Sequence, residues 1–347
     1  MRSGPAGAKI VSRREPSRRS RVASAGIAAA ALIMVAAGCQ ATGTGAGSSG
    51  LTRSSITVAA QPGVDDAPLY MAIRNGLFAK AGLTVHIQTY SSAANEISAL
   101  ASGSADIAIG DYADFFFAQD TGARRGFTIV ADAYDAAPSV MEVLTLPGSG
   151  ITKPQQLQGK TIGTPEPQGI PFSTRLPYSE ETLATQSVLT NDGVNVANVG
   201  WKALPTGQLV TALQNHQVDA ILASEPAIYQ AEIQLGASEV IDSCSGQTAS
   251  LPLSGYFALG SFAHKYRSTV LAFRSALLEA QSQASQAAQV QAVLASDEHM
   301  GTQTASLVTL GQYPTSVKAS NIQRVASLMS SFNLLNPPLD VAQMIFH

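Results

Sequence analysis

Short apolar runs alternate with amphipathic stretches along most of residues 55–260, and this alternation is typical of an α/β fold. The apolar runs are bounded by turn residues and predict strands at 56–60, 84–88, 105–110, 128–133, 140–146, 199–204, 220–224 and 256–259. Apolar positions at three- and four-residue spacing predict helices at 68–77, 93–101, 179–192 and 206–215, after Pro226, and in the stretches 263–299 and 317–335. Strands that alternate with helices favour parallel sheets, whose strand ends meet at one edge.

The stretch 65–85 shows how one such unit is built. Pro68 suits the first turn of a helix, where its missing N–H is harmless. One face of this predicted helix is apolar and carries Leu69, Ala72, Ile73 and Leu77. Asp65 and Asp66 lie between the preceding strand and this helix, so we expect them at the mouth of a sheet, where open parallel sheets bind ligands.

Two motifs in this pattern resemble a known family. Residues 68–85 read PLYMAIRNGLFAKAGLTV, and residues 157–163 read LQGKTIG. They are similar to the opening, and to the beginning of the second lobe, of the substrate-binding proteins of ABC importers for nitrate, sulfonates, taurine and thiamine-precursor pyrimidines. The similarity extends along nearly all of residues 55–265. It implies a two-lobed clamp like the type II periplasmic binding proteins, each lobe a mostly parallel sheet with flanking helices, joined by two crossover hinges.

The resemblance also implies a domain division. Lobe I is expected at 55–146 plus 252–347 and lobe II at 147–251, with hinges near 144–150 and 248–255. A weak internal repeat, 99–108 against 212–221, agrees with two similar lobes, although unrelated α/β proteins also repeat such units. Asp106 and Asp219 begin the repeated strands, far from the ligand edge, and we interpret them as structural.

The N-terminus is typical of an exported protein. Seven Lys and Arg residues and one acid, Glu15, precede residue 22, and an apolar run follows at 22–38, too short for a membrane span. Residues 1–38 are therefore interpreted as a signal peptide. The sequence AAGC at 36–39 resembles a bacterial lipobox, which implies lipid on Cys39 and a flexible, lipidated tether at 39–54. The alternative is ordinary signal cleavage nearby, which leaves a soluble exported protein.

Charge and cysteine content narrow the class further. Without residues 1–38 the chain keeps 14 Lys and Arg against 23 Asp and Glu, a net charge of about −9, so no basic face for nucleic acid is expected. A lipidated Cys39 leaves only Cys244, so stability must come from the core rather than from disulfides.

We find no motif that predicts catalysis, a metal site or a cofactor. There is no Gly-x-Ser-x-Gly elbow, P-loop or His-Glu-x-x-His motif, and the five histidines are not at metal-ligand spacing. The glycines at 45–50 match the dinucleotide fingerprint by letter, but no strand precedes them and no helix follows. A yeast enzyme of similar fold makes the thiamine pyrimidine and has a Cys-rich stretch for iron, which this sequence lacks. We therefore predict no enzyme.

Polar and aromatic residues at the ends of the predicted strands would line a cleft between the lobes. From lobe I these are Asp65, Asp66, Ser91, Ser92, Asp111, Tyr112, Tyr134 and Asp135. From lobe II they are Pro165, Glu166, Gln168, Phe172, Arg175, Tyr178, Thr206, Glu225 and Tyr229. Acids outnumber the one base, which favours N–H donors or a cation over an oxyanion. Several of these acids can instead cap the helices that follow them.

Together these features predict an exported, monomeric solute-binding lipoprotein, anchored by lipid to the outer face of the cell membrane. It would close on a small molecule and present it to an ABC permease and its ATPase. The predicted ligand is an N–H-rich heterocycle such as a thiamine-precursor pyrimidine. The alternatives are an aliphatic sulfonate, taurine or nitrate as ligand, or a sensor that uses the same clamp without import.

Overall fold

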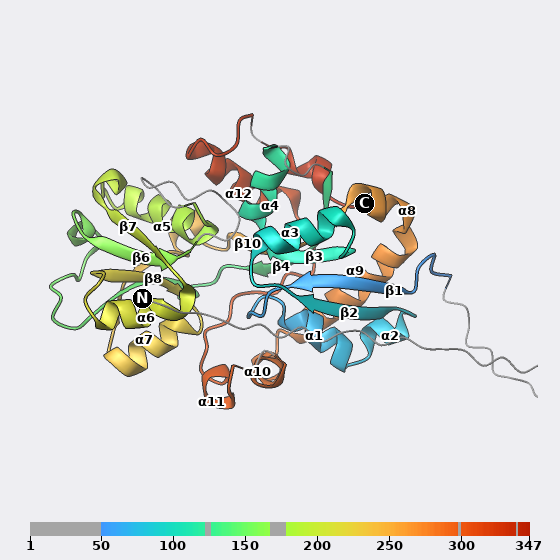
Figure 1. Cartoon of the computed structure of the whole chain (residues 1–347), viewed down its shortest axis with the longest axis horizontal. Helices are drawn as coiled ribbons and strands as arrows, with labels where there is room; N and C mark the ends of the chain where they lie inside the picture. The colour runs from blue at the N-terminus through green and yellow to red at the C-terminus, as the bar shows by residue number, and fades with distance from the viewer. Residues whose placement is uncertain (1–49, 122–125, 167–177, 298–299, 338) are drawn as a thin grey trace, which may run out of the picture. The chain divides into compact units, whose positions relative to one another are not determined.

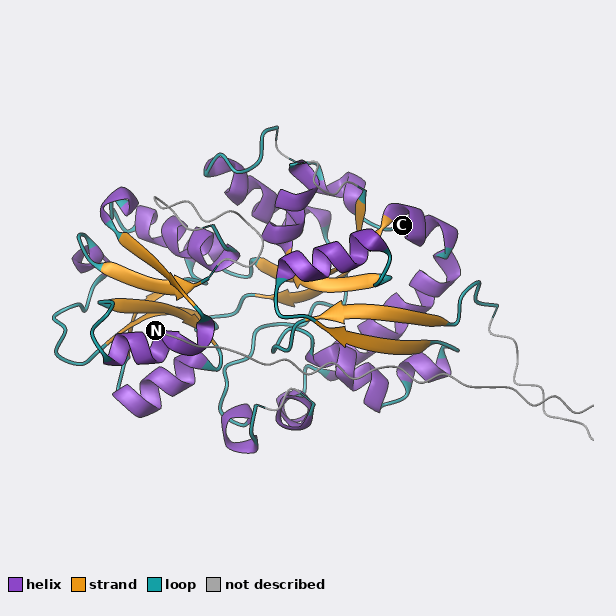
Figure 2. Cartoon of the chain, viewed as in Figure 1, coloured by secondary structure: helices purple, strands orange, loops and turns teal. Residues whose placement is uncertain are grey.

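Two five-stranded sheets form the framework of the protein in its computed structural model, which describes residues 50–121, 126–166, 178–297, 300–337 and 339–347 (Figure 1, Figure 2). The expected signal peptide and Cys39 lie outside the described residues. No helix in the described ranges is both long enough and apolar enough to cross a membrane.

The first sheet has the strand order β2-β1-β3-β10-β4. Its strands are β1 (Ser55–Ala60), β2 (Thr84–Thr89), β3 (Ile107–Asp111), β4 (Phe127–Asp135) and β10 (Pro252–Leu259). β1 is parallel to β2 and β3, whereas β10 is antiparallel to both β3 and β4. Four strands therefore share one direction, and their carboxyl ends reach the same edge of the sheet, as the sequence predicted.

Helices cover both faces of this sheet, and we call the whole unit the first lobe (Figure 1). One face carries α1 (Ala67–Arg74), α2 (Leu77–Lys80), α9 (Arg267–Gln283) and α10 (Ala287–Ser296). The other carries α3 (Ala93–Ser102), α4 (Tyr112–Asp120) and α12 (Ala319–Ser331). The shorter α8 (Gly260–Lys265) and α11 (Thr302–Ala305) complete it. The C-terminal helices thus pack on the first lobe, as the family resemblance implied.

The second sheet has the order β7-β6-β8-β5-β9 and forms the second lobe. Its strands are β5 (Met141–Thr145), β6 (Thr161–Pro165), β7 (Gly200–Leu204), β8 (Ala220–Ser224) and β9 (Ser238–Asp242). The helix α5 (Glu180–Asn191) packs on one face, and α6 (Leu209–Gln214) and α7 (Ala227–Leu235) pack on the other. Short 3-10 turns are η1 (Pro154–Leu157), η2 (Val196–Asn198), η3 (Thr206–Gln208), η4 (Gly246–Thr248) and, in the first lobe, η5 (Val341–Met344).

The first crossing between the sheets differs from the expected one. We assigned the strand at 140–146 to lobe I and placed a hinge at 144–150, but β5 pairs with β8 and β9 in the second sheet. The chain therefore changes sheets at 136–140, before β5. The second crossing lies between β9 and β10, at 243–251, and overlaps the expected hinge at 248–255.

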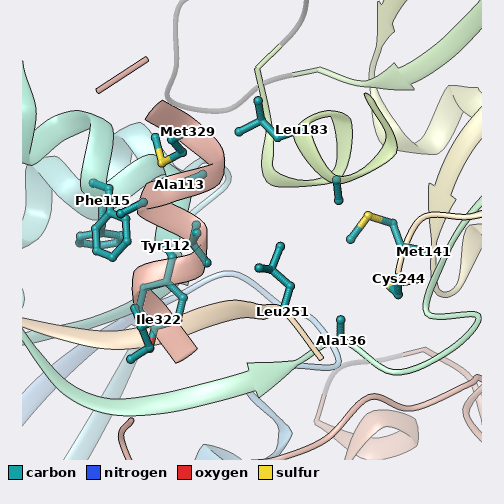
Figure 3. Close-up of a cluster of buried hydrophobic side chains, with 14 of the residues drawn as sticks. Tyr112, Ala113, Phe115, Ala136, Met141, Leu183, Cys244, Leu251, Ile322 and Met329 are labelled. Atoms are coloured by element: carbon teal, nitrogen blue, oxygen red, sulfur yellow. The ribbon is translucent and has the colours of Figure 1, made fainter. Parts of the chain in front are cut away.

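Alternation along the strands divides the interior into layers. Ile107 and Ile109 of β3 join the core under α1 and α9, whereas Ala108 between them joins the core under α3 and α4. This follows from the two-residue period of a strand. The second of these cores continues into the second lobe, where Leu183 of α5 and Met141 of β5 belong to it (Figure 3).

The repeated aspartates have the structural role that the sequence predicted. Asp106 accepts a hydrogen bond from the backbone N–H of Thr57 at 2.9 Å, and Asp219 accepts one from the N–H of Thr161 at 2.8 Å. Each carboxylate thereby joins the start of one parallel strand to the start of its neighbour. The two lobes therefore share this device at equivalent positions of their sheets.

The sequence did not predict every element. The helix α4 and the strands β6 and β9 were missed altogether. The helical stretch expected over 68–77 divides into α1 and α2 at Gly76, a residue suited to end a helical turn, whose φ of 66° stops the first helix. Leu77 therefore begins a new helix. Ile73, expected on the buried face, is 40% exposed.

Candidate ligand-binding site

Two adjoining cavities lie where the strand ends of the two sheets meet. The first has a volume of about 200 Å³ and is lined by Gln61, Pro62, Asp65, Ala93, Ile109, Gly110, Asp111, Asp114, Pro165, Glu166, Ser179, Glu181 and Thr206. The second has a volume of about 230 Å³ and is lined by Pro62, Gly63, Val64, Asp65, Asp111, Tyr134, Met141, Glu180, Glu181, Ser224, Glu225, Leu253 and Ser254.

The two cavities share one wall, so we treat them as a single cleft. Pro62, Asp65, Asp111 and Glu181 line both of them. Pro62 and Asp65 belong to the turn between β1 and α1, Asp111 ends β3, and Glu181 lies in the first turn of α5. The cleft is thus built from loops and helix starts of both lobes.

The turn before α1 has a shape that depends on glycine. A Cβ atom added at Gly63 would lie 2.6 Å from Oδ1 of Asp65, closer than real Cβ contacts. Glycine at this position therefore lets the Asp65 carboxyl fold back against its own turn and face the cleft. The pKa of Asp65 is raised by burial, an effect that a hydrogen bond with Ser254 partly offsets.

Carboxyl groups dominate the electrostatics of the cleft. Burial, and then the neighbouring Glu181, Asp114, Asp65 and Glu96, raise the pKa of Asp111 well above its usual value. Burial and Glu181 raise the pKa of Asp114 to about 7. None of the residues that the structure places in the lining of the two cavities is Lys, Arg or His.

Glu180 is the most enclosed acid in the lining of the two cavities and joins the two lobes. Its side chain is 3% exposed, and its Oε2 atom accepts a long hydrogen bond, 3.4 Å, from the backbone N–H of Ala113 in α4. Its Oε1 atom is buried without a hydrogen-bond partner. Burial, and then the charge of Asp111, raise the pKa of Glu180 well above its usual value.

Glu96 lies behind the cleft and is fully buried in α3. Gln61, which lines the first cavity, donates from Nε2 to Glu96 Oε2 at 2.8 Å. Burial raises the pKa of Glu96 to about 8, and the hydrogen bond from Gln61 works against that rise. Gln61 is therefore held in the cavity wall by a carboxyl group of α3.

Several predicted site residues do line the cleft. The structure places seven there, namely Asp65, Asp111, Tyr134, Pro165, Glu166, Thr206 and Glu225. Tyr134 stacks obliquely on Tyr313, with 5.2 Å between ring centroids, and its hydroxyl accepts from the backbone N–H of Gly311. Gln168, Phe172 and Arg175 lie outside the described residues.

Glu225 has a second role that the sequence did not indicate. Its Oε1 accepts from the N–H of Thr309 at 2.9 Å, and its Oε2 accepts from the N–H of Tyr229 at 3.2 Å. Tyr229 is in α7 of the second lobe, whereas Thr309 belongs to the C-terminal region that packs on the first lobe. Glu225 therefore connects the lobes while it lines the cleft, and burial raises its pKa.

Tyr112 is not in the cleft, contrary to our expectation. It is 0% exposed, and its hydroxyl donates to Asp132 Oδ1 at 2.9 Å inside the first lobe. Gly255 of β10 makes room for the ring, since a Cβ there would lie 2.6 Å from the hydroxyl oxygen. The residue begins the unpredicted helix α4, which turns its side chain inward.

The remaining expected residues lie around the cleft rather than in the lining of its two cavities. Asp66 is fully buried just before α1, next to Tyr256, whose pKa is raised by burial and by Asp66 and Asp65. Ser92 caps α3 by accepting from the N–H of Asn95 at 3.3 Å. Ser91, Tyr178, Tyr229 and Asp135 also fall outside the lining of the cavities.

Sequence reasoning missed the acids Asp114, Glu180 and Glu181. Asp114 lies in a helix that was not predicted, and the other two open the helix that follows Ser179, where acids are common because they favour the helix dipole. That position gave no sign that the helix start faces the first lobe. Among the described residues, no group of three or more His, Cys, Asp or Glu side chains is arranged to hold a metal ion.

Comparisons with known proteins agree with this architecture. A family model described as NMT1/THI5 like matches residues 64–290. The curated proteins contain no match. Among solved structures, the periplasmic aliphatic sulphonate binding protein SsuA from Escherichia coli is 18% identical with a TM-score of 0.64, over 85% of this chain and 98% of that one.

Two further structures show the same fold. The periplasmic nitrate-binding protein NrtA from Synechocystis PCC 6803 is 14% identical with a TM-score of 0.66, over 85% of this chain and 86% of that one. The desulfurization enzyme DSZB is also 14% identical, with a TM-score of 0.65, over 84% of this chain and 96% of that one. The two sheets with flanking helices therefore form a periplasmic-binding-protein-like fold, and this fold is shared by binding proteins and by an enzyme.

Proposed function

The chain belongs to the NMT1/THI5-like family, and from this premise we propose that it captures a small molecule between its two lobes and delivers it to an ABC importer. The observation that carries the proposal is the cleft itself, because both of its cavities are lined by residues of both lobes. A ligand held by both lobes stabilises their closed arrangement, which a permease can recognise. The partners are thus the ligand, the permease and its ATPase.

We assign the ligand to the class of N–H-rich heterocycles, of which a thiamine-precursor pyrimidine is one example. Asp65, Asp111 and Glu181 offer carboxyl oxygens to N–H groups, and Tyr134 adds a flat aromatic surface at the second cavity. The alternative is an anion, since the names of SsuA and NrtA state sulphonate and nitrate binding. Buried acids disfavour an anion because it repels their ionised forms, whereas N–H donors or a cation stabilise those forms.

Export and anchoring complete the proposal. The basic and apolar segments of residues 1–38 support export, and AAGC at 36–39 supports attachment of lipid to Cys39, which would hold the monomer at the outer face of the cell membrane. A binding role rather than catalysis is supported by the names of SsuA and NrtA, which state binding. A sensor that uses the same clamp without import remains the second candidate, and genes for a permease and an ATPase beside this one would argue against it.

Ligand-induced closure tests the binding function. The protein is screened by thermal shift against thiamine precursors, amidines, flavins, taurine, alkanesulfonates and nitrate, because a ligand that binds the folded state raises its stability. Any stabilising compound is then added in small-angle scattering, where closure should reduce the radius of gyration. An unchanged radius at saturating ligand would contradict the clamp, and mass spectrometry that shows an unmodified Cys39 would contradict the lipid anchor.

A further inference from the structure

We propose that the cleft is built for an organic cation that carries an amidinium or guanidinium group, and that Glu180 supplies the acceptor which selects this charge. The inference rests on the proposed binding function and narrows its ligand. It starts from an oxygen atom that the fold buries without a hydrogen-bond partner, in a residue that lines a cavity between both lobes.

The Oε1 atom of Glu180 lacks a hydrogen-bond partner in the protein. Glu180 lines the second cavity, is 3% exposed, and this oxygen accepts no hydrogen bond. A buried acceptor without a partner is costly, whereas a charged N–H donor makes one of the stronger hydrogen bonds available to it. The side chain is therefore satisfied by a ligand that brings N–H groups into the second cavity.

Two helices begin at the cleft, and the start of one of them is occupied by an acid of the chain itself. The α4 and α5 helices both begin there, and free N–H groups at such positions attract anions. Here the N–H of Ala113 in the first turn of α4 is directed to Glu180 Oε2, and Asp111 immediately precedes that helix. At the start of α4, a carboxyl group of the chain itself thus takes an N–H group that an anionic ligand would use.

The ionisable groups around Glu180 add negative charge to the cleft. The titratable groups that act on Glu180 are Asp111 from the end of β3, Glu181 from its own helix, and Asp114 from α4, and all of them are acids. Asp111 in turn faces Asp65 and Glu96. Acids from β3, α4, α5 and the turn before α1 therefore line one cleft. Burial raises the pKa of most of them, so a bound cation would favour their ionised forms and displace protons.

The shape of the second cavity fits a flat cation with an apolar body. Met141, Leu253 and Tyr134 line it together with the acids, so apolar and carboxyl groups are both available to a ligand there. An amidinium or guanidinium group is planar and presents parallel N–H donors that match a carboxylate. An ammonium ion lacks this planar match, and a neutral amide of the same shape lacks the charge.

Benzamidine and benzamide provide matched probes, because they share shape and ring but differ in charge. Calorimetry with the full-length protein at pH 7 is expected to show benzamidine binding at least about tenfold more tightly than benzamide, a difference of about 1.4 kcal/mol. Benzamidine binding should release protons, which measurements in buffers of different ionisation enthalpy detect. Its affinity should therefore increase as the pH rises from 5 to 8.

The variant Glu180→Gln removes the charge and keeps the size of the side chain. We expect it to weaken benzamidine binding by about tenfold or more and to change benzamide binding much less, because glutamine keeps an acceptor oxygen but no charge. Glu279→Gln, at an exposed position of α9, is the control with the same change in net charge and should bind like the parent protein. If Glu180→Gln does not fold, Glu181→Gln is measured in its place.

Three results would overturn the inference: equal binding of the two probes, no benzamidine binding at millimolar concentration, or unchanged benzamidine affinity in the glutamine variants. Binding of taurine or nitrate that is lost in Arg175→Ala would also overturn it. All of these leave the proposed binding function intact as long as some compound of the wider screen closes the lobes. Failure of the binding function would instead appear as no change in scattering with any compound.

Discussion

The two lobes have the same sheet plan but place their acids differently. In each, three parallel strands are followed by an antiparallel strand and a last strand that runs with the first three. The first lobe brings Asp65 and Asp111 to the cleft from strand ends, whereas the second brings Glu180 and Glu181 from a helix start. The shared plan thus fixes where the cleft forms, and the connections decide which charges fill it.

The lobes also differ in how much space surrounds a glycine in one of their strands, Gly255 in the first lobe and Gly163 in the second. Gly255 in β10 faces the buried ring of Tyr112, whereas Gly163 in β6 faces the ends of Leu204 and Val218. An added Cβ would lie 2.6 Å from the Tyr112 hydroxyl oxygen but 3.3 Å from the two aliphatic side chains. The first lobe therefore has less room to adjust at this point than the second.

The largest expected effect tests this difference. Gly255→Ala should reduce the free energy of unfolding by about 3 kcal/mol, because the Tyr112 ring is fully enclosed and is bonded to Asp132. Gly163→Ala should cost about 1 kcal/mol or less, since aliphatic side chains can shift by a few tenths of an ångström. Urea unfolding of both variants measures the two values. Equal losses would show that the packing of the two sheets is equally tolerant.

The sequence predicted the parts of this comparison that depend on local pattern. The roles of Asp106 and Asp219 and the placement of Asp65 followed from strand ends and from one repeated segment. The position of Tyr112 did not, because it depends on Gly255, which lies more than a hundred residues further along the chain. Periodicity identified β5 as a strand but could not assign it to a sheet. For the same reason the contact of Glu180 with Ala113, made between two lobes, had no local signal.

The pH dependence of stability compares the buried acids of the two lobes, whose pKa values are raised. Asp114 and Glu96 of the first lobe have pKa values raised to about 7 and about 8, and Glu142 of the second lobe has one raised to about 7, in each case chiefly by burial. Most of the groups that face these acids are acids themselves. Asp114 is faced by Glu181, and Glu96 is faced by Gln61, Asp65 and Asp114. Glu142 is faced by Ser139, Glu239, Glu232 and Asp242.

An acid with a raised pKa keeps its proton in the folded state after the unfolded chain has lost it. The free energy of unfolding of the unliganded protein should therefore fall as the pH rises from about 4 to about 8, and then level off, by a total on the order of 2 kcal/mol or more. Asp114→Asn should reduce the part of this decrease in the free energy of unfolding that comes from the first lobe. Glu142→Gln should reduce the part that comes from the second lobe. Denaturant unfolding at a series of pH values measures both, and a stability that rises over this range would contradict the assigned shifts.

The smallest expected effect compares the two repeated aspartates. Asp106 is 7% exposed and also pairs with Arg53 at 2.8 Å, whereas Asp219 is 40% exposed and lies 3.6 Å from Lys160. Replacing Asp106 with Ala leaves the N–H of Thr57 without its acceptor in a more enclosed place, so we expect a loss of about 2 kcal/mol. At Asp219 water can replace the carboxylate at the N–H of Thr161, so Asp219→Ala should cost about 1 kcal/mol or less.

Asp106→Asn, which keeps an acceptor oxygen, separates the lost hydrogen bond from the lost charge and should recover about half of the loss. A larger loss for Asp219→Ala than for Asp106→Ala in urea unfolding would show that burial does not set the strength of this shared device.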